Sequence, residues 1–215
     1  MKIFYAPRNG LGGSEAVYAL LESMYISEHG APMPMIKKTA NGKPYFPDRP
    51  DVHFSLSHSR THVLCALTDR PVGADIETPR VFSERTIRYF CAPDELSHFS
   101  PLELWVLKES YIKLVGGHLG MVKTIRFSCD NGRIITPENT TLSKLYTLGE
   151  CRAAVTVYND SFATFIPADC AATSVSNGSS TPSAYNDSPA SIASEIVLAN
   201  ISTSPSGAGR RPPTL

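Results

Sequence analysis

The sequence has no excess of charge of either sign and no long apolar run. Its 20 Lys and Arg residues balance 20 Asp and Glu residues, for a formal net charge of +0. A nucleic-acid-binding domain needs clustered basic residues to match phosphate charge, so nucleic acid is not an expected partner. No apolar segment approaches the roughly 20 residues that a membrane-spanning helix requires, and the opening stretch is too short for a signal peptide. These absences predict a cytoplasmic protein without a membrane partner.

Cysteine is sparse and badly placed for cross-links or zinc. The 5 cysteines are odd in number, widely spaced, and form no Cys-x-x-Cys pair: Cys65, Cys91, Cys129, Cys151 and Cys170. A disulfide framework is typical of short secreted chains with an even number of cysteines, and a zinc site of Cys-x-x-Cys spacing. The sequence also contains no internal repeat. We therefore expect reduced, mostly buried thiols, which agrees with a cytoplasmic location.

Composition divides the chain into three parts. Its 215 residues suffice for one domain or two small ones with a sizeable core. We expect a reduced N-terminal subdomain at residues 1–50 and a catalytic domain at residues 51–166. Residues 167–215 are dominated by Ala, Ser, Thr, Asn, Gly and Pro, a composition typical of a disordered tail, with a transient helix expected at 189–201.

Hydrophobic periodicity predicts an α+β fold in which an antiparallel sheet packs against helices. Residues 51–57, 62–68 and 71–77 are joined by short polar turns, so we expect them to form one antiparallel meander. A further strand is expected at 2–6, and helices at 14–28, 83–89, a short segment from 92, and 101–115. Later strands are expected at 124–129, 132–135, 142–148, 151–157 and 161–166, the last two as a pair.

The helix over residues 101–115 has the clearest boundaries. Ser100 is suited to the N-cap, Pro101 to the first helical position, and Glu103 to the third residue of a capping box. Gly116 can end the helix in a left-handed conformation. Leucine and tyrosine recur at the spacing of one buried face. These signals predict a stable helix packed on the core.

Two carboxylates lie side by side in the strand at 71–77. Alternation along a strand places Asp75 and Glu77 on one face and Val72, Ala74 and Ile76 on the other. Like charges so close repel each other, and a bound cation would relieve that repulsion. The alternative interpretation is that the strand merely exposes one polar face to water.

A pair of oppositely charged residues lies on the helix. Glu109 and Lys113 are four residues apart and are therefore neighbours on the helix surface, roughly opposite its apolar stripe. Taken alone, they would be an ordinary exposed ion pair worth about 0.3–0.5 kcal/mol.

Four segments in a set order resemble the 4′-phosphopantetheinyl transferase superfamily, in its Sfp-type branch. That family is marked by a Gly-x-Asp-x-Glu strand followed about thirty residues later by a Trp-x-x-Lys-Glu-Ser-x-x-Lys helix. The corresponding segments here are Gly42-Lys43-Pro44, Phe54-Ser55-Leu56-Ser57-His58-Ser59, Gly73-Ala74-Asp75-Ile76-Glu77 and Trp105-Val106-Leu107-Lys108-Glu109-Ser110-Tyr111-Ile112-Lys113.

The resemblance implies a reaction and assigns roles to residues. Such enzymes transfer the phosphopantetheine arm of coenzyme A to a serine of an acyl or peptidyl carrier protein, as in fatty acid biosynthesis, and release 3′,5′-ADP. Asp75, Glu77 and Glu109 are then expected to bind Mg²⁺, which prefers hard oxygen ligands. Glu109 is the first candidate for the general base and Glu77 the second. Lys113 is expected to neutralise charge on the pyrophosphate.

The resemblance also implies how coenzyme A is held. Lys43 and His58 match family positions that contact the coenzyme, and the Ser57 hydroxyl is a further candidate. The N-terminal half is shorter than in the family, so Arg8, Lys37 and Lys38 are weaker candidates for missing basic contacts. We expect a monomer, with an oligomer as the alternative. Arg85 and Arg88 are candidates to meet an acidic carrier protein.

Two other functions fit the same residues. One is a Mg²⁺-dependent hydrolase of the coenzyme A pyrophosphate, with water as the nucleophile. The other is an inactive module that only binds a carrier protein or coenzyme A. The acidic residues argue against the module, because a protein without activity has no physical need for three converging carboxylates.

Overall fold

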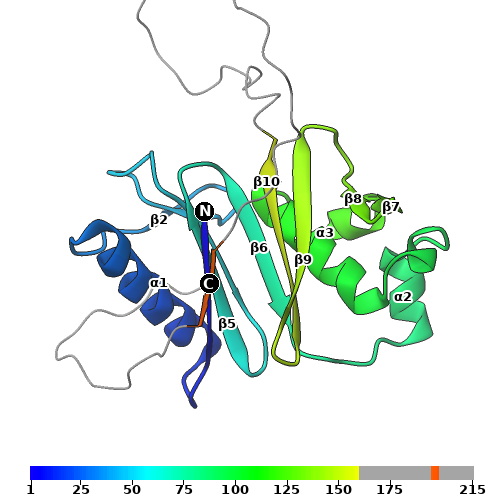
Figure 1. The fold of residues 1–215 in the computed structure, drawn as a ribbon, viewed down its shortest axis with the longest axis horizontal. Coiled ribbons are helices and arrows are strands. Elements are labelled where there is room, and N and C mark those ends of the chain that lie inside the picture. Colours follow the sequence, from blue (N-terminus) through cyan, green and yellow to red (C-terminus); the bar gives the residue numbers. More distant parts are fainter. Residues whose placement is uncertain (160–194, 199–215) are drawn as a thin grey trace, which may run out of the picture.

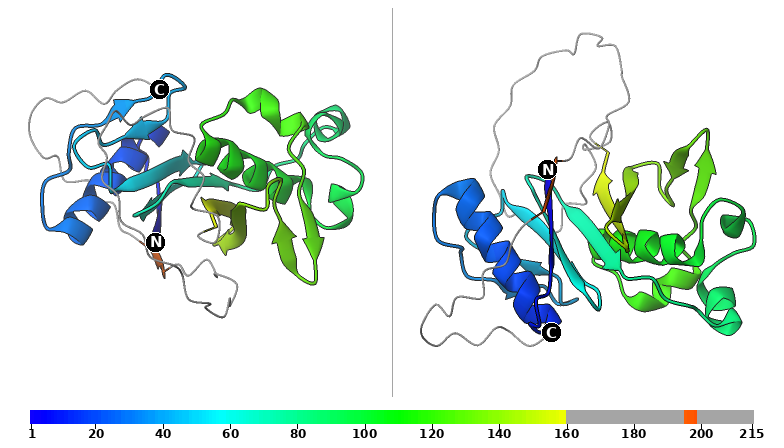
Figure 2. Two further views of the ribbon diagram at one scale, coloured as in Figure 1. Left: turned by 90° about the horizontal axis from the view of Figure 1, so that it is seen from above. Right: turned by 60° about the horizontal axis from the view of Figure 1, so that its bottom comes forward.

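Two β-sheets lie face to face between two helices in the computed structural model, which describes residues 1–159 and 195–198 (Figures 1 and 2). Helix α1 covers the outer face of one sheet, and helix α3 covers the outer face of the other. The inner faces meet in a third apolar cluster, to which Ile3 and Leu64 come from the first sheet and Val155 from the second. Each sheet is therefore covered on both faces.

The first sheet has the strand order β11-β1-β5-β4. It contains β1 (Lys2–Pro7), β4 (His53–His58), β5 (His62–Thr68) and β11 (Glu195–Leu198). Helix α1 (Gly13–His29) ends at Gly30 in the left-handed conformation and packs on this sheet. Strand β1, from the expected N-terminal subdomain, thus belongs to the same sheet as β4 and β5, and α1 packs on that sheet.

The second sheet has the order β6-β10-β9 and is antiparallel throughout. It contains β6 (Val72–Glu77), β9 (Thr141–Leu148) and β10 (Cys151–Tyr158). Two small hairpins complete the strands: β2 (Lys37–Lys38) with β3 (Pro44–Tyr45), and β7 (Ser128–Asp130) with β8 (Arg133–Ile135).

Helix α3 (Pro101–Val115) has the boundaries that its capping residues predicted. The Ser100 hydroxyl accepts a hydrogen bond from the backbone of Glu103, the Glu103 carboxylate accepts one in return, and Gly116 is left-handed. Helix α2 (Glu84–Phe90) and the 3₁₀ helices η1 (Glu95–Ser97) and η2 (Leu119–Lys123) flank α3 on the side away from the first sheet (Figure 1).

The predicted meander of three strands is wrong in its third member. Strands β4 and β5 pair antiparallel as expected, but β6 pairs with β10 in the second sheet. The free edge of β6 faces β4, where the hydroxyls of Ser55 and Ser57 accept hydrogen bonds from the backbone of Ala74 (2.9 Å) and Ile76 (3.3 Å). Serine side chains thus replace the carbonyl groups that a neighbouring strand would supply.

The expected helix at residues 189–201 is contradicted where the structure describes it. Residues Glu195–Leu198 form strand β11, parallel to β1, and extend the first sheet. The expected strand at 161–166 and the rest of the expected tail lie outside the described residues. Strand β10 instead forms its hairpin with β9.

The helices and the cysteines of residues 1–159 and 195–198 bear on the expectations about membranes and disulfides. None of its helices combines the length and apolar character that a membrane crossing demands. Its four cysteines, Cys65, Cys91, Cys129 and Cys151, are all free thiols.

Candidate active site

Strand β6 carries the acidic pair, and its two faces differ as the alternation predicted. Val72, Ala74 and Ile76 are fully buried between the two sheets. Gly73, on the other face, lies so close to α3 that an added Cβ would meet the Ser110 carbonyl oxygen at 1.9 Å. Only glycine permits this approach, and it brings the helix residues next to the strand's carboxylates.

Asp75 is buried at the junction of β4, β6 and α3, with 5% of its surface exposed. Its Oδ1 accepts a hydrogen bond from the Ser57 hydroxyl at 2.6 Å and from the Lys113 amine at 2.7 Å. Its Oδ2 is buried and has no partner among the described residues. The alternative of a merely solvent-exposed face therefore does not apply to Asp75.

The helix presents Glu109 and Lys113 to the same place. Both side chains are half-buried, and Lys113 forms its ion pair with Asp75. The interpretation of Glu109 and Lys113 as an ordinary exposed pair is wrong, because the close approach at Gly73 turns this side of the helix toward β6.

These side chains line one cavity of about 380 Å³. The catalytic, metal-binding and main coenzyme-binding residues expected from the family resemblance all border it: Lys43, Ser57, His58, Asp75, Glu77, Glu109 and Lys113. Helix α1 contributes Val17 and Tyr18, and Trp105 comes from α3. The cavity thus joins acidic residues of the second sheet and α3 with apolar residues of α1 and β4.

Two of the carboxylates are less acidic than usual. Burial, aided by the negative charge of Asp75, raises the pKa of Glu109 to about 7. Burial also raises the pKa of Glu77, against the opposing charge of Arg80, whose guanidinium lies 3.8 Å from the Glu77 carboxylate. A carboxylate with a raised pKa gains most from a nearby cation, which favours its charged form.

Arg80 and Trp105 form a wall beside Glu77 that the sequence did not reveal. The Arg80 guanidinium lies 4.9 Å from the centre of the Trp105 ring and 4.5 Å from that of Phe82. Such stacking on aromatic faces holds a cation in place at partly exposed sites. Trp105 belongs to the family motif, but nothing in its spacing indicated that it would line the cavity.

Lys43 supplies positive charge at the cavity, and His58 supplies a hydrogen-bonding ring. The Lys43 amine donates to the carbonyls of Leu114 (3.0 Å) and Val72 (3.3 Å), and burial lowers its pKa to about 8. Burial lowers the pKa of His58 as well, with further lowering from Arg8 and Lys113. At pH 7 Lys43 therefore remains largely protonated.

The other basic candidates do not border the cavity. Arg8 donates to the backbone carbonyls of Leu11 (2.8 Å) and Arg60 (3.2 Å), so it braces two loops. Lys37 and Lys38 form the short strand β2. On α2, Arg88 is an exposed residue 3.3 Å from Glu84, and Arg85 is exposed.

The carboxylates of Asp75, Glu77 and Glu109 fit a Mg²⁺ ion that takes most of its ligands from substrate phosphates and water. Within residues 1–159 and 195–198, no three His, Cys, Asp or Glu side chains are gathered at metal-binding spacing. Mg²⁺ is commonly held by one or two carboxylates, with water and substrate phosphates completing the shell, rather than by an all-protein cage. The unpartnered Oδ2 of Asp75, beside Glu77 and Glu109, fits that arrangement.

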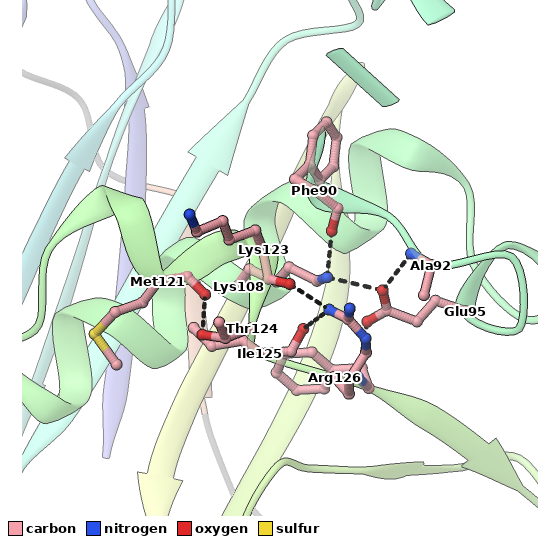
Figure 3. A network of polar contacts seen from close by, with 10 residues as sticks. Phe90, Ala92, Glu95, Lys108, Met121, Lys123, Thr124, Ile125 and Arg126 are labelled. Carbon is pink, nitrogen blue, oxygen red and sulfur yellow. Dashed lines mark hydrogen bonds and ion pairs between the residues drawn. The ribbon is translucent and has the colours of Figure 1, made fainter. Parts of the chain in front are cut away.

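A buried ion pair behind α3 escaped the sequence analysis (Figure 3). The Lys108 amine lies 2.8 Å from Glu95 Oε2, and both side chains are fully buried. Lys108 also donates to the Phe90 carbonyl, while Glu95 accepts from the backbone of Ala92 and Phe127. The pair ties α2, η1 and the approach to β7 onto the back of α3.

This pair fixes the surroundings of Trp105. The Phe90 ring meets the Trp105 ring edge-on at 5.2 Å between centres. Lys108 is adjacent in sequence to Glu109 but points away from the cavity. The position of Lys108 in the Trp-x-x-Lys-Glu motif marked it as a residue of interest. The sequence did not show that its side chain points away from the cavity toward Glu95.

The matched region of the chain agrees with the motifs. Residues 71–163 match the family model described as the 4′-phosphopantetheinyl transferase superfamily. This range contains Asp75, Glu77, Glu109 and Lys113, whereas Lys43, Ser57 and His58 precede it. The resemblance inferred from the four motifs is thereby confirmed.

Curated relatives carry the same class name. The chain is 37% identical over 90 residues to "4′-phosphopantetheinyl transferase Sfp" of Bacillus subtilis (strain 168), covering 37% of this chain and 40% of the relative. It is 34% identical over 121 residues to "4′-phosphopantetheinyl transferase psf-1" of Bacillus pumilus, covering 51% of this chain and 50% of the relative. The matches thus span half or less of these relatives.

Proposed function

We propose that this protein is an enzyme that transfers the 4′-phosphopantetheine arm of coenzyme A to a serine of an acyl or peptidyl carrier protein. The observation that carries the proposal is the shared cavity, where Asp75, Glu77, Glu109 and Lys113 meet Lys43 and His58. Carboxylates beside basic side chains suit nucleophilic attack on a pyrophosphate. The carboxylates can hold a metal ion or accept a proton, and the basic residues neutralise phosphate charge. The names of the relatives supply the reaction class.

Mg²⁺ is the metal we assign to the acidic residues. Asp75 would bind through its unpartnered Oδ2, with Glu77 and Glu109 as the candidates for a further carboxylate. The ion would draw negative charge from the pyrophosphate oxygens when bound. The orientation of Asp75 is set by the chain itself, since Ser57 and Lys113 occupy its other oxygen.

Glu109 is our first choice for the general base, and Glu77 remains the second. In the transfer, the serine oxygen of the carrier forms a bond to the β-phosphorus of coenzyme A, and the bond from that phosphorus to the bridging oxygen breaks. The serine proton passes to the carboxylate, and 3′,5′-ADP leaves with the bridging oxygen. Lys113, 2.7 Å from Asp75, can stabilise the negative charge that develops on the leaving group.

Coenzyme A is held, in this proposal, by the basic side of the cavity. Lys43 and His58 are the cationic or hydrogen-bonding partners for its phosphates. Ser57 takes part indirectly as well, because its hydroxyl is bonded to Asp75. The carrier protein would approach from solvent in the cytoplasm, where coenzyme A and free thiols coexist, and the enzyme would act as a monomer.

Mass spectrometry of an apo carrier protein tests the proposal. Incubation with this protein, coenzyme A and Mg²⁺ should add one phosphopantetheine mass to the carrier serine, and Asp75→Asn should remove the gain. No gain with several acyl and peptidyl carriers would contradict transfer. Release of 3′,5′-ADP without a carrier would instead indicate a pyrophosphate hydrolase.

A further inference from the structure

The Tyr18 hydroxyl is a buried polar atom that the proposed reaction does not use. Among the described residues, two buried side-chain polar atoms lack a hydrogen-bond partner, the Tyr18 hydroxyl and Asp75 Oδ2. Both residues line the same cavity. Because buried polar groups are nearly always hydrogen-bonded in proteins, each exception requires an explanation. The proposed Mg²⁺ would bind the unpartnered Oδ2 of Asp75. The unpartnered hydroxyl of Tyr18 still needs an explanation.

Tyr18 lies at the apolar side of the cavity. It is 91% buried on α1, and Val17, Phe54 and Leu56 line the cavity with it. Burial raises the pKa of Tyr18, so its hydroxyl is neutral at physiological pH and can donate or accept one hydrogen bond. A ligand that fits here needs apolar faces and a polar edge.

The nearby His58 ring, whose nitrogens can form hydrogen bonds, narrows the choice of ligand further. Phe54, Leu56 and His58 alternate along β4 and therefore share the face toward α1. His58 lies so close to the start of α1 that a Cβ on Gly13 would meet its ring at 2.7 Å. An apolar wall thus continues directly to His58, the residue proposed above to bind a phosphate of coenzyme A. A 3′-phosphorylated nucleoside carries a flat base and a phosphate on one ribose, whereas the phosphopantetheine arm carries only the transferred phosphate.

We propose that Tyr18 is a specificity residue whose hydroxyl bonds to the polar edge of the adenine ring of coenzyme A. The ring lies against the apolar wall of α1 and β4, and the 3′-phosphate lies toward His58. This inference rests on coenzyme A being the substrate, but it concerns the nucleotide half alone. It can therefore be tested by binding, without transfer.

The test compares two buried tyrosines of one helix. Tyr18→Phe removes the unpartnered hydroxyl, and Tyr25→Phe is the matched control, since the Tyr25 hydroxyl accepts a 2.7 Å hydrogen bond from Arg49 and lies outside the cavity. Binding of 3′,5′-ADP and of 4′-phosphopantetheine is measured by calorimetry, and the melting temperature of each ligand-free protein by scanning calorimetry.

The two substitutions should affect ligand affinity and melting temperature in opposite ways. Tyr18→Phe should weaken 3′,5′-ADP binding about threefold to tenfold, the usual value of one hydrogen bond, and leave 4′-phosphopantetheine binding unchanged. Its melting temperature should stay the same or rise, because no protein partner loses a bond. Tyr25→Phe should lower the melting temperature and leave the affinity for 3′,5′-ADP unchanged.

Other outcomes overturn the assignment. Unchanged 3′,5′-ADP affinity in Tyr18→Phe would remove the hydroxyl from the ligand, whatever the melting temperature does. Weakened binding of 4′-phosphopantetheine alone would place the other half of the coenzyme at Tyr18. If the wild-type protein binds 3′,5′-ADP through Tyr18 but modifies no carrier, this inference stands and the transferase proposal fails.

Discussion

The Ser57 hydroxyl donates a 2.6 Å hydrogen bond to Asp75 Oδ1 and accepts one from the backbone of Ile76 at 3.3 Å. One oxygen thus joins the edge of β4 to the edge of β6 and fixes the carboxylate between them. Asp75 borders the cavity, and its remaining oxygen has no partner among the described residues. Replacing a group that orients a metal ligand typically costs about 10-fold to 100-fold in metal affinity or activity.

Ser57→Ala should therefore weaken Mg²⁺ activation about tenfold or more. The measurement is the Mg²⁺ concentration that gives half-maximal carrier modification. Ser55→Ala is the matched control, because the Ser55 hydroxyl accepts from the backbone of Ala74 and touches no carboxylate. Equal Mg²⁺ requirements in the two variants would show that Ser57 serves only to join the strands.

Lys113→Met should lower kcat/KM for carrier modification about 100-fold or more, the usual loss when a charge-stabilising group is removed. Lys113 has two physical roles here, since it pairs with Asp75 at 2.7 Å and borders the cavity. Lys123→Met, an exposed position outside the cavity, controls for the lost charge. A loss below threefold, with the fold intact by circular dichroism, would exclude Lys113 from the reaction.

Lys108→Met should lower the free energy of unfolding by about 3–5 kcal/mol, because it leaves the charge of Glu95 buried and unpaired. Urea unfolding can be followed by fluorescence, since Trp105 is the 1 tryptophan of the chain and packs on Phe90. The double variant Glu95→Gln/Lys108→Met removes both charges and should recover part of the loss. A cost below about 1 kcal/mol for the single variant would contradict the role of the pair.

Stability should rise with pH between about 8 and 10.5 through Lys43. Burial lowers its pKa from 10.5 to about 8 in the folded protein. In this window the unfolded chain binds more protons than the folded chain, and the slope of stability with pH is then positive. Below about pH 8 both states are protonated, and the contribution is constant.

The measurement is the difference in unfolding free energy between the wild type and Lys43→Met at several pH values. Subtraction removes the contribution of other buried groups whose pKa is raised by burial, such as Tyr18 and Cys151. The difference should change in favour of the wild type from pH 8 to 10.5. A flat difference over this range would show that the Lys43 amine is not desolvated.

Helix ends and the alternation of side chains along a strand could be predicted from the sequence by itself, because both depend on neighbouring residues. Ser100, Glu103 and Gly116 predicted both ends of α3, because capping depends on residues within one turn of the helix. Alternation along β6 predicted which side chains share a face, since the strand period is a property of the backbone. The family resemblance carried by the motifs predicted most of the charged side chains that border the cavity, but not Trp105.

Only the tertiary structure decided how those side chains are partnered. The bonds of Asp75 reach Ser57 and Lys113, which are 18 and 38 residues away, and Glu95 meets Lys108 across 13 residues. Helical spacing favoured a Glu109–Lys113 pair, but the contact of Gly73 with α3 gave Lys113 a buried partner instead. Likewise, short turns favoured a meander that placed β6 beside β5. The structure instead pairs β6 with β10, which places Val72, Ala74 and Ile76 between the two sheets and Gly73 against α3. Pairing between strands so distant in the chain depends on the packing of the whole fold, so no local turn signal could predict it.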